Sequence, residues 1–134
     1  MKKIMYLLII ISVTFTMACK KNTEKMIVGK WMVVQAEMKD SSREMTDEEK
    51  EIYKKASEVF IGQIWVYNED KTYKLGESNS GGTYRLSEDG KTLYTTGEYG
   101  EMDEQISEIS DTKLVLTRTS KSNFVTTYTL AREK

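Results

Sequence analysis

From Gly62 onward the sequence consists of short segments in which apolar and polar residues alternate, and turn-forming residues separate these segments. Tyr73 and Leu75, for example, flank the polar Lys74. A period of two places successive side chains on opposite faces of a strand, so each segment has one buried and one solvated face. Connections this short favour pairing between neighbours in the sequence. The pattern therefore predicts an all-β chain in which antiparallel strands follow one another up and down.

Eight segments fit this description, counting a first strand rich in Trp, Val and Met. They are residues 29–38, 63–67, 72–75, 83–86, 92–96, 102–109, 113–119 and 124–132. Eight strands can close into a barrel, which leaves no exposed sheet edge and encloses either packed side chains or one small ligand. The side chains that we expect to point inward and to line any ligand cavity are Tyr73, Leu75, Tyr84, Leu86, Leu114, Leu116 and Tyr128.

A single helix is predicted over residues 46–60, in the connection between the first two strands. Thr46 and Glu49 have the spacing of a capping box, in which each side chain bonds the backbone of the other residue. One face carries apolar residues at helical spacing: Ile52, Tyr53, Ala56, Val59 and Phe60. This face either packs on the core or covers a ligand cavity as a lid.

The register of the first strand has two solutions. Trp31 and Val33 share a face with Gln35, whereas the opposite face, which includes Met32 and Val34, is more apolar. Either a β-bulge or a second apolar layer beneath the helix would reconcile these faces.

Residues 1–18 have the features of a secretory signal, with a basic start, a short apolar run and Ala18 before the only cysteine, Cys19. Residues 16–19 resemble a bacterial lipobox. That resemblance implies cleavage before Cys19 and attachment of lipid, including palmitate, to its thiol. Several acyl chains on one residue would anchor the protein firmly. An uncleaved N-terminal anchor is the alternative.

The predicted organisation is a removed signal peptide (1–18), a polar tether that carries the lipid (19–26) and one domain (27–134). By resemblance to lipoproteins of Gram-negative bacteria, Lys20 lacks the acidic character associated with retention in the inner membrane. We therefore expect anchoring in the cell envelope at the outer membrane, with the side it faces left open.

The composition excludes several kinds of chemistry. There is no His, which removes Ser-His-Asp and Cys-His catalysis and His-ligated zinc. The net charge of −1 is unlike that of a nucleic-acid-binding domain. We expect no enzymatic activity, no cofactor and no metal. The sequence also contains an acidic patch, which comprises Glu101, Asp103, Glu104 and Glu108. A calcium site and a solvated strand surface are the two interpretations, and we favour the second.

Gly29-Lys30-Trp31 resembles the G-x-W motif that opens the first strand of lipocalins, and Arg132 stands at the end of the last strand. The stretch from Tyr67 to Tyr73 is similar to the second hairpin of small bacterial lipocalin-like lipoproteins. In lipocalins a basic residue in the position of Arg132 packs across the Trp at the closed end of the barrel. Arg118, which shares a face with inward-pointing leucines, is the competing candidate for this contact.

Two functions are compatible with these features. The first is a membrane-anchored lipocalin-like binding protein for a small hydrophobic or amphipathic ligand. The second is a protein-interaction module with a filled barrel, such as an inhibitor, an immunity-type partner or an envelope accessory lipoprotein. Its partner is not identified by the sequence, and its contacts would come from residues 76–82, 94–101 and the acidic strand.

Overall fold

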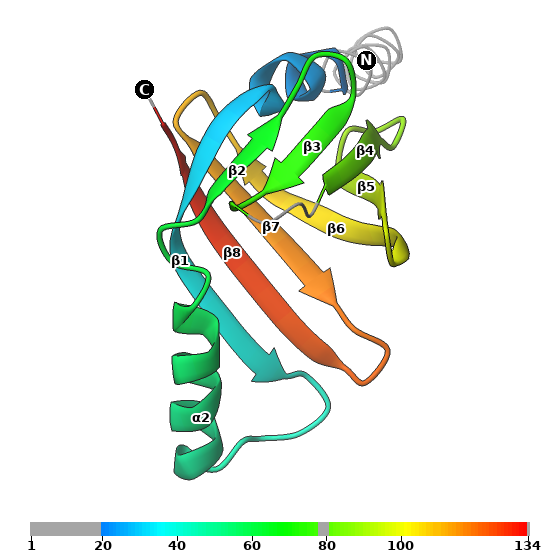
Figure 1. Cartoon of the computed structure of the whole chain (residues 1–134). Coiled ribbons are helices and arrows are strands. Elements are labelled where there is room, and N and C mark those ends of the chain that lie inside the picture. The colour runs from blue at the N-terminus through cyan, green and yellow to red at the C-terminus, as the bar shows by residue number, and fades with distance from the viewer. Residues whose placement is uncertain (1–19, 78–80, 134) are drawn as a thin grey trace, which may run out of the picture.

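The computed structural model describes residues 20–77 and 81–133, so the predicted signal peptide and Cys19 lie outside the described residues. The strands form a closed barrel in sequence order, and every neighbouring pair is antiparallel (Figure 1). The elements are β1 (Gly29–Asp40), α2 (Asp47–Glu58), β2 (Ile64–Tyr67), β3 (Thr72–Leu75), β4 (Gly81–Leu86), β5 (Thr92–Gly97), β6 (Gly100–Ile109), β7 (Lys113–Thr119) and β8 (Phe124–Arg132). The predicted fold class, an eight-stranded up-and-down barrel with a helix between its first two strands, is confirmed.

β1 contains a bulge that settles its register. It pairs with β8 from Trp31 to Asp40, and the register shifts between Val33 and Gln35. Trp31 and Val33 are buried before the bulge, whereas Ala36 packs against the core after it. Because the bulge contains one extra residue, odd-numbered side chains point inward before it and even-numbered side chains point inward after it. This explains why neither face of the strand is apolar along its whole length in the sequence.

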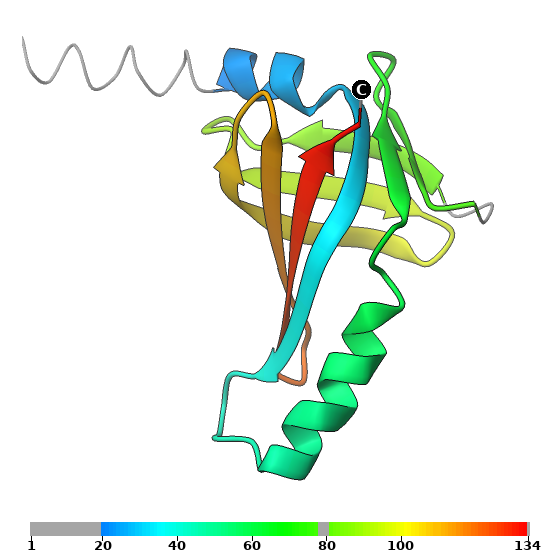
Figure 2. The same ribbon diagram turned by 90° about the vertical axis from the view of Figure 1, so that its left-hand side faces the viewer.

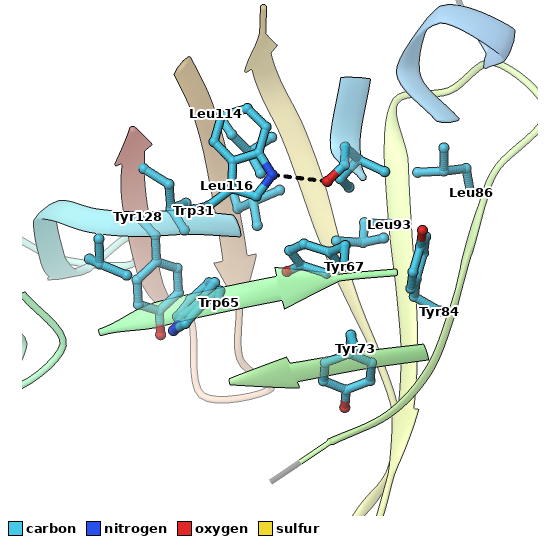
Figure 3. Packing of buried hydrophobic residues seen from close by; sticks show 13 residues of the cluster. Trp31, Trp65, Tyr67, Tyr73, Tyr84, Leu86, Leu93, Leu114, Leu116 and Tyr128 are labelled. Carbon is cyan, nitrogen blue, oxygen red and sulfur yellow. Dashed lines mark hydrogen bonds between the residues drawn. The ribbon is translucent and has the colours of Figure 1, made fainter. Parts of the chain in front are cut away.

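One end of the barrel is closed around Trp31. Its side chain is completely buried, and its indole N–H donates a hydrogen bond of 2.9 Å to the carbonyl oxygen of Ile27 (Figure 3). The Arg132 guanidinium lies 4.2 Å from the centre of the Trp31 ring. Arg132, and not Arg118, is therefore the cation that packs on this tryptophan.

Arg132 also joins segments that are distant in the sequence. Its guanidinium donates to the carbonyl oxygens of Asp111 at 2.6 Å and Val28 at 2.8 Å, and to that of Met26. Gly29 makes room for this arrangement. Its φ is +137°, and a Cβ there would lie 2.5 Å from Nη1 of Arg132, so a larger residue would be strained and would collide with the guanidinium.

Residues 20–27 are helical and cover the same end of the barrel, opposite the end beside α2 (Figure 2). Thr23 and Ile27 are buried. The segment also touches the β4–β5 turn, since a Cβ on Gly90 would lie 3.0 Å from the Cα of Lys20. The described part of the expected tether, residues 20–26, is thus part of the fold, because Thr23 is buried and Lys20 lies against the β4–β5 turn.

α2 begins with the predicted capping box, which joins Thr46 and Glu49 in both directions. Its apolar face is less covered than the sequence indicates: Ile52 and Val59 are 57% and 68% exposed. The helix meets the barrel mainly along β1, and Tyr53 also contacts Phe124 of β8, with ring centres 5.0 Å apart. Among the described residues, no helix combines the length and the apolar character needed to cross a membrane.

We expect Arg132→Gln to lower the free energy of unfolding by about 2 kcal/mol or more, because charged hydrogen bonds at a closed, half-buried site are lost. Urea denaturation measures this. Arg85→Gln is the matched control: its guanidinium also lies on a ring, 3.9 Å from the centre of Tyr94, but its side chain is 60% exposed. Equal losses in both variants would contradict a special role for Arg132.

Candidate functional site

A cavity of about 930 Å³ opens beside the connection between α2 and β2. β1 pairs with β2 only from Gly29 to Met32 and then continues along β8, so the two strands separate at this point. The residues that line the cavity come from the α2–β2 connection, from β1, β2 and β3 with the two residues after β3, and from the inner faces of β7 and β8. Lys30, Val66 and Lys74 are in register on the face opposite Trp65, so the cavity extends to the outside of the barrel. The bulged path of β1 therefore leaves access to the interior between these elements.

The inner wall of the cavity is aromatic. Trp65 and Tyr128 meet edge-to-face with ring centres 4.8 Å apart (Figure 3). Phe60 meets Tyr128 edge-on at 5.3 Å. The indole N–H of Trp65 donates to the side-chain oxygen of Gln63 at 3.1 Å, which fixes the orientation of its ring. Such a wall offers a large apolar contact area with few polar groups.

Much of the remaining interior is filled by side chains. Tyr67 packs edge-on against Tyr84 at 5.3 Å and lies 6.3 Å from Tyr73. The Tyr84 hydroxyl donates to the carbonyl oxygen of Asn68 at 2.7 Å. Polar atoms of this cluster are thus partly satisfied within the barrel itself.

The seven residues expected to line a cavity divide into two groups. Leu75 and Tyr128 line the cavity described above. The other five are buried in the packed core and do not reach its wall: Tyr73, Tyr84, Leu86, Leu114 and Leu116. Their inward orientation follows from the strand period, whereas contact with a ligand stays a prediction for all seven.

An ion pair lies inside the barrel behind the cavity wall. Arg118 lines the cavity, and its guanidinium lies 3.3 Å from a carboxylate oxygen of Glu104. The Glu104 side chain is only 2% exposed and that of Arg118 28%. The prediction that the acidic patch is a solvated surface is therefore wrong for Glu104. The signal in the sequence was the spacing of two between Glu104 and Ile106, which puts both on one face of the strand. The structure adds that Glu104 pairs with the buried Leu93 across the sheet.

Three buried polar atoms in this region have no hydrogen-bond partner among residues 20–77 and 81–133. They are Oη of Tyr67, Oε2 of Glu104 and Nε of Arg118. Burial raises the pKa of the Tyr67 hydroxyl well above its ordinary value. Burial also raises the pKa of Glu104, although the charge of Arg118 opposes this shift. Unpaired polar atoms in a protein interior are uncommon and call for a physical or functional explanation.

The other acidic residues of the patch lie at the surface. Glu101 lies 3.5 Å from Arg85, and Glu108 lies 3.3 Å from Lys113, both in exposed pairs. In the part of the chain that the structure describes, no three Asp, Glu, Cys or His side chains are grouped to hold a metal ion.

Comparison with known families finds one match. A family model described as a lipocalin-like domain matches residues 27–116, from the end of the helical segment 20–27 into β7. The comparison with curated proteins finds no match.

Removing one partner of the buried pair Glu104–Arg118 should destabilise the folded protein. We expect Glu104→Met or Arg118→Met alone to lower the free energy of unfolding by about 3 kcal/mol, because the other charge is left uncompensated. The double variant should lose less than the sum, with a coupling of about 1–3 kcal/mol. Urea denaturation of all four proteins measures this coupling.

The control cycle uses Glu108 and Lys113, whose charged atoms are also 3.3 Å apart but whose side chains are about half exposed. Exposed pairs contribute at most about 1 kcal/mol. A coupling for the buried pair no larger than that of the exposed pair would contradict the importance of burial here.

Proposed function

Because the chain belongs to the lipocalin-like domain family, we propose that it binds a small hydrophobic or amphipathic ligand in the cavity beside Trp65. The observation that carries this proposal is the cavity itself. Its volume of about 930 Å³ lies within the range of about 300–1,000 Å³ that is usual for small-molecule sites. The paired strands and the packed closed end hold the residues of this wall in place.

The chemistry of the lining favours a ligand with an apolar body and a polar end. Phe60, Trp65 and Tyr128 supply the apolar wall, and Arg118 is a polar group at the inner side. Lys30 and Lys74 also line the cavity. Apolar surface removed from water stabilises binding by about 25 cal/mol per Å². The few charged groups would orient the ligand.

We further propose that the protein is anchored to the cell envelope by lipid on Cys19, at the outer membrane. The sequence of residues 1–19 supports this proposal. The helical segment 20–27 packs on the barrel end, so the lipid would follow almost directly from the folded domain. The activity proposed is binding without catalysis, in keeping with the absence of His from the sequence.

A second candidate function is protein interaction. The observation that favours it is the β5–β6 turn, where Tyr99 is 92% exposed. An exposed aromatic residue at a hairpin tip provides contact area for a protein partner. In this case the barrel would be only a scaffold for its loops.

Intrinsic fluorescence separates these functions, since the chain has two tryptophans. A brominated long-chain alcohol should quench Trp65 by contact in the cavity and leave Trp31 at the closed end unaffected. We therefore expect saturable quenching in Trp31→Phe and none in Trp65→Phe. Titration of both variants with the same alcohol measures this. Absence of saturable quenching in Trp31→Phe would contradict ligand binding in the cavity.

The anchor is tested by Cys19→Ser. In cells fed labelled palmitate, we expect the unaltered protein to carry label and to sediment with membranes, because the thiol holds the lipid. The variant should lose both properties. Label that persists in Cys19→Ser would exclude this residue as the acylation site.

A further inference from the structure

The buried pair Glu104–Arg118 has an arrangement that bears on which ligand the cavity accepts. Arg118 stands between the cavity and Glu104: it lines the cavity, whereas Glu104 lies behind it and is almost completely buried. The pair is electrically neutral but incompletely hydrogen-bonded, since Oε2 of Glu104 and Nε of Arg118 have no partner in the described structure. The nearby hydroxyl of Tyr67 is also unpartnered there.

Several charged or titratable groups act on this pair from the surrounding strands. Arg118 on β7 and Asp103 on β6 act on Glu104. Tyr67 on β2 and Tyr128 on β8 act on Arg118. The ring of Tyr128 also lies 5.9 Å from the guanidinium carbon. Among the groups that act on the pair Arg118 is the cation, and Glu104 already neutralises it. Lys30 and Lys74 also line the cavity, but both are exposed to solvent, which screens their charges.

We propose that the cavity selects amphiphiles that end in a carboxyl group, and that each such ligand binds at Arg118 with uptake of one proton, held either by the ligand or by Glu104. The proposal rests on the proposed function, since it assigns the ligand class of the same cavity.

The proton follows from the charge balance. A carboxylate that reaches Arg118 from the cavity brings a second negative charge to one guanidinium. Two carboxylates that share a site in a water-poor interior do not both stay ionised, so the pKa of one of them rises strongly. One proton therefore enters from solution and resides on the ligand or on Glu104, and no covalent bond changes. The ligand oxygens can accept from the part of the Arg118 guanidinium that lines the cavity.

Because binding takes up a proton, the affinity for the ligand depends on pH in a fixed direction. Burial already raises the pKa of Glu104 in the free protein. At a pH above the pKa of Glu104, both Glu104 and the free ligand are ionised, and binding takes up a proton from solution. The affinity for a carboxylate should then fall about tenfold per pH unit as the pH rises. Between the pKa values of the two free groups one of them already carries the proton, and the affinity should become independent of pH.

Calorimetry on the unaltered protein tests the inference without any substitution. Decanoate is titrated at neutral pH in two buffers with different enthalpies of ionisation, and the difference in heat gives the number of protons taken up. We expect about one proton per decanoate and none for decanol, which has a chain of the same length and no charge. Decyltrimethylammonium should bind more weakly than either, since it places a cation beside Arg118.

The outcomes separate the two proposals. Binding of neither decanol nor decanoate would overturn the proposed function. Binding of decanol together with proton-free binding of decanoate, or with no binding of decanoate, would overturn this inference and leave the proposed function standing.

Glu104→Gln provides a second measurement, because glutamine cannot be ionised. The variant should bind decanoate with little dependence on pH and at least about tenfold more tightly at neutral pH than the unaltered protein. Glu101→Gln is the matched control, since Glu101 is on the same strand but exposed. A pH dependence in Glu104→Gln equal to that of the control would overturn the role of Glu104. If Glu104→Gln does not fold, the calorimetry above decides.

Discussion

Closure of the barrel depends on the contact between Trp31 and Arg132, the residues at which the first and last strands meet. The indole N–H of Trp31 donates a hydrogen bond to the carbonyl oxygen of Ile27, and the guanidinium of Arg132 packs on the indole ring. Arg132 then bonds backbone carbonyls before β1 and after β6. One side chain therefore ties together both ends of the domain and the β6–β7 turn. A cation that stacks on indole while its N–H groups satisfy carbonyls suits this position, because guanidinium does both at once.

The cavity follows from the same strand. At the closed end β1 is paired on both sides, with β2 and β8. Val33 still exchanges backbone hydrogen bonds with Gly62 and Gln63, just before β2. Beyond Val33, β1 pairs with β8 alone among the strands, and the bulge between Val33 and Gln35 changes which residues face inward. The chain then continues through α2, whose contact with the barrel is mainly along β1. The opening is thus a consequence of how β1 is divided between its two partners, and Phe60 and Trp65 line it because they lie where β2 begins.

The buried pair Glu104–Arg118 is costly to maintain, because both charges lose hydration inside the barrel. An apolar pair of similar size could fill the same space. The orphaned atoms show that the surrounding residues do not fully satisfy the pair. A ligand carboxylate at Arg118 would add a favourable contact to the one member of the pair that lines the cavity.

Periodicity in the sequence determined the number of strands, their bounds to within two residues and the inner face of most of them. These properties are local, because the period of two depends only on neighbouring residues. Applied strictly to β6, the same rule would have placed Glu104 inside with Ile106. Only the tertiary structure decided that Arg132 rather than Arg118 covers Trp31, that residues 20–27 pack on the barrel, and where the interior is open. These features depend on contacts between segments up to about a hundred residues apart and on how side-chain volumes fill the barrel, which no local pattern encodes.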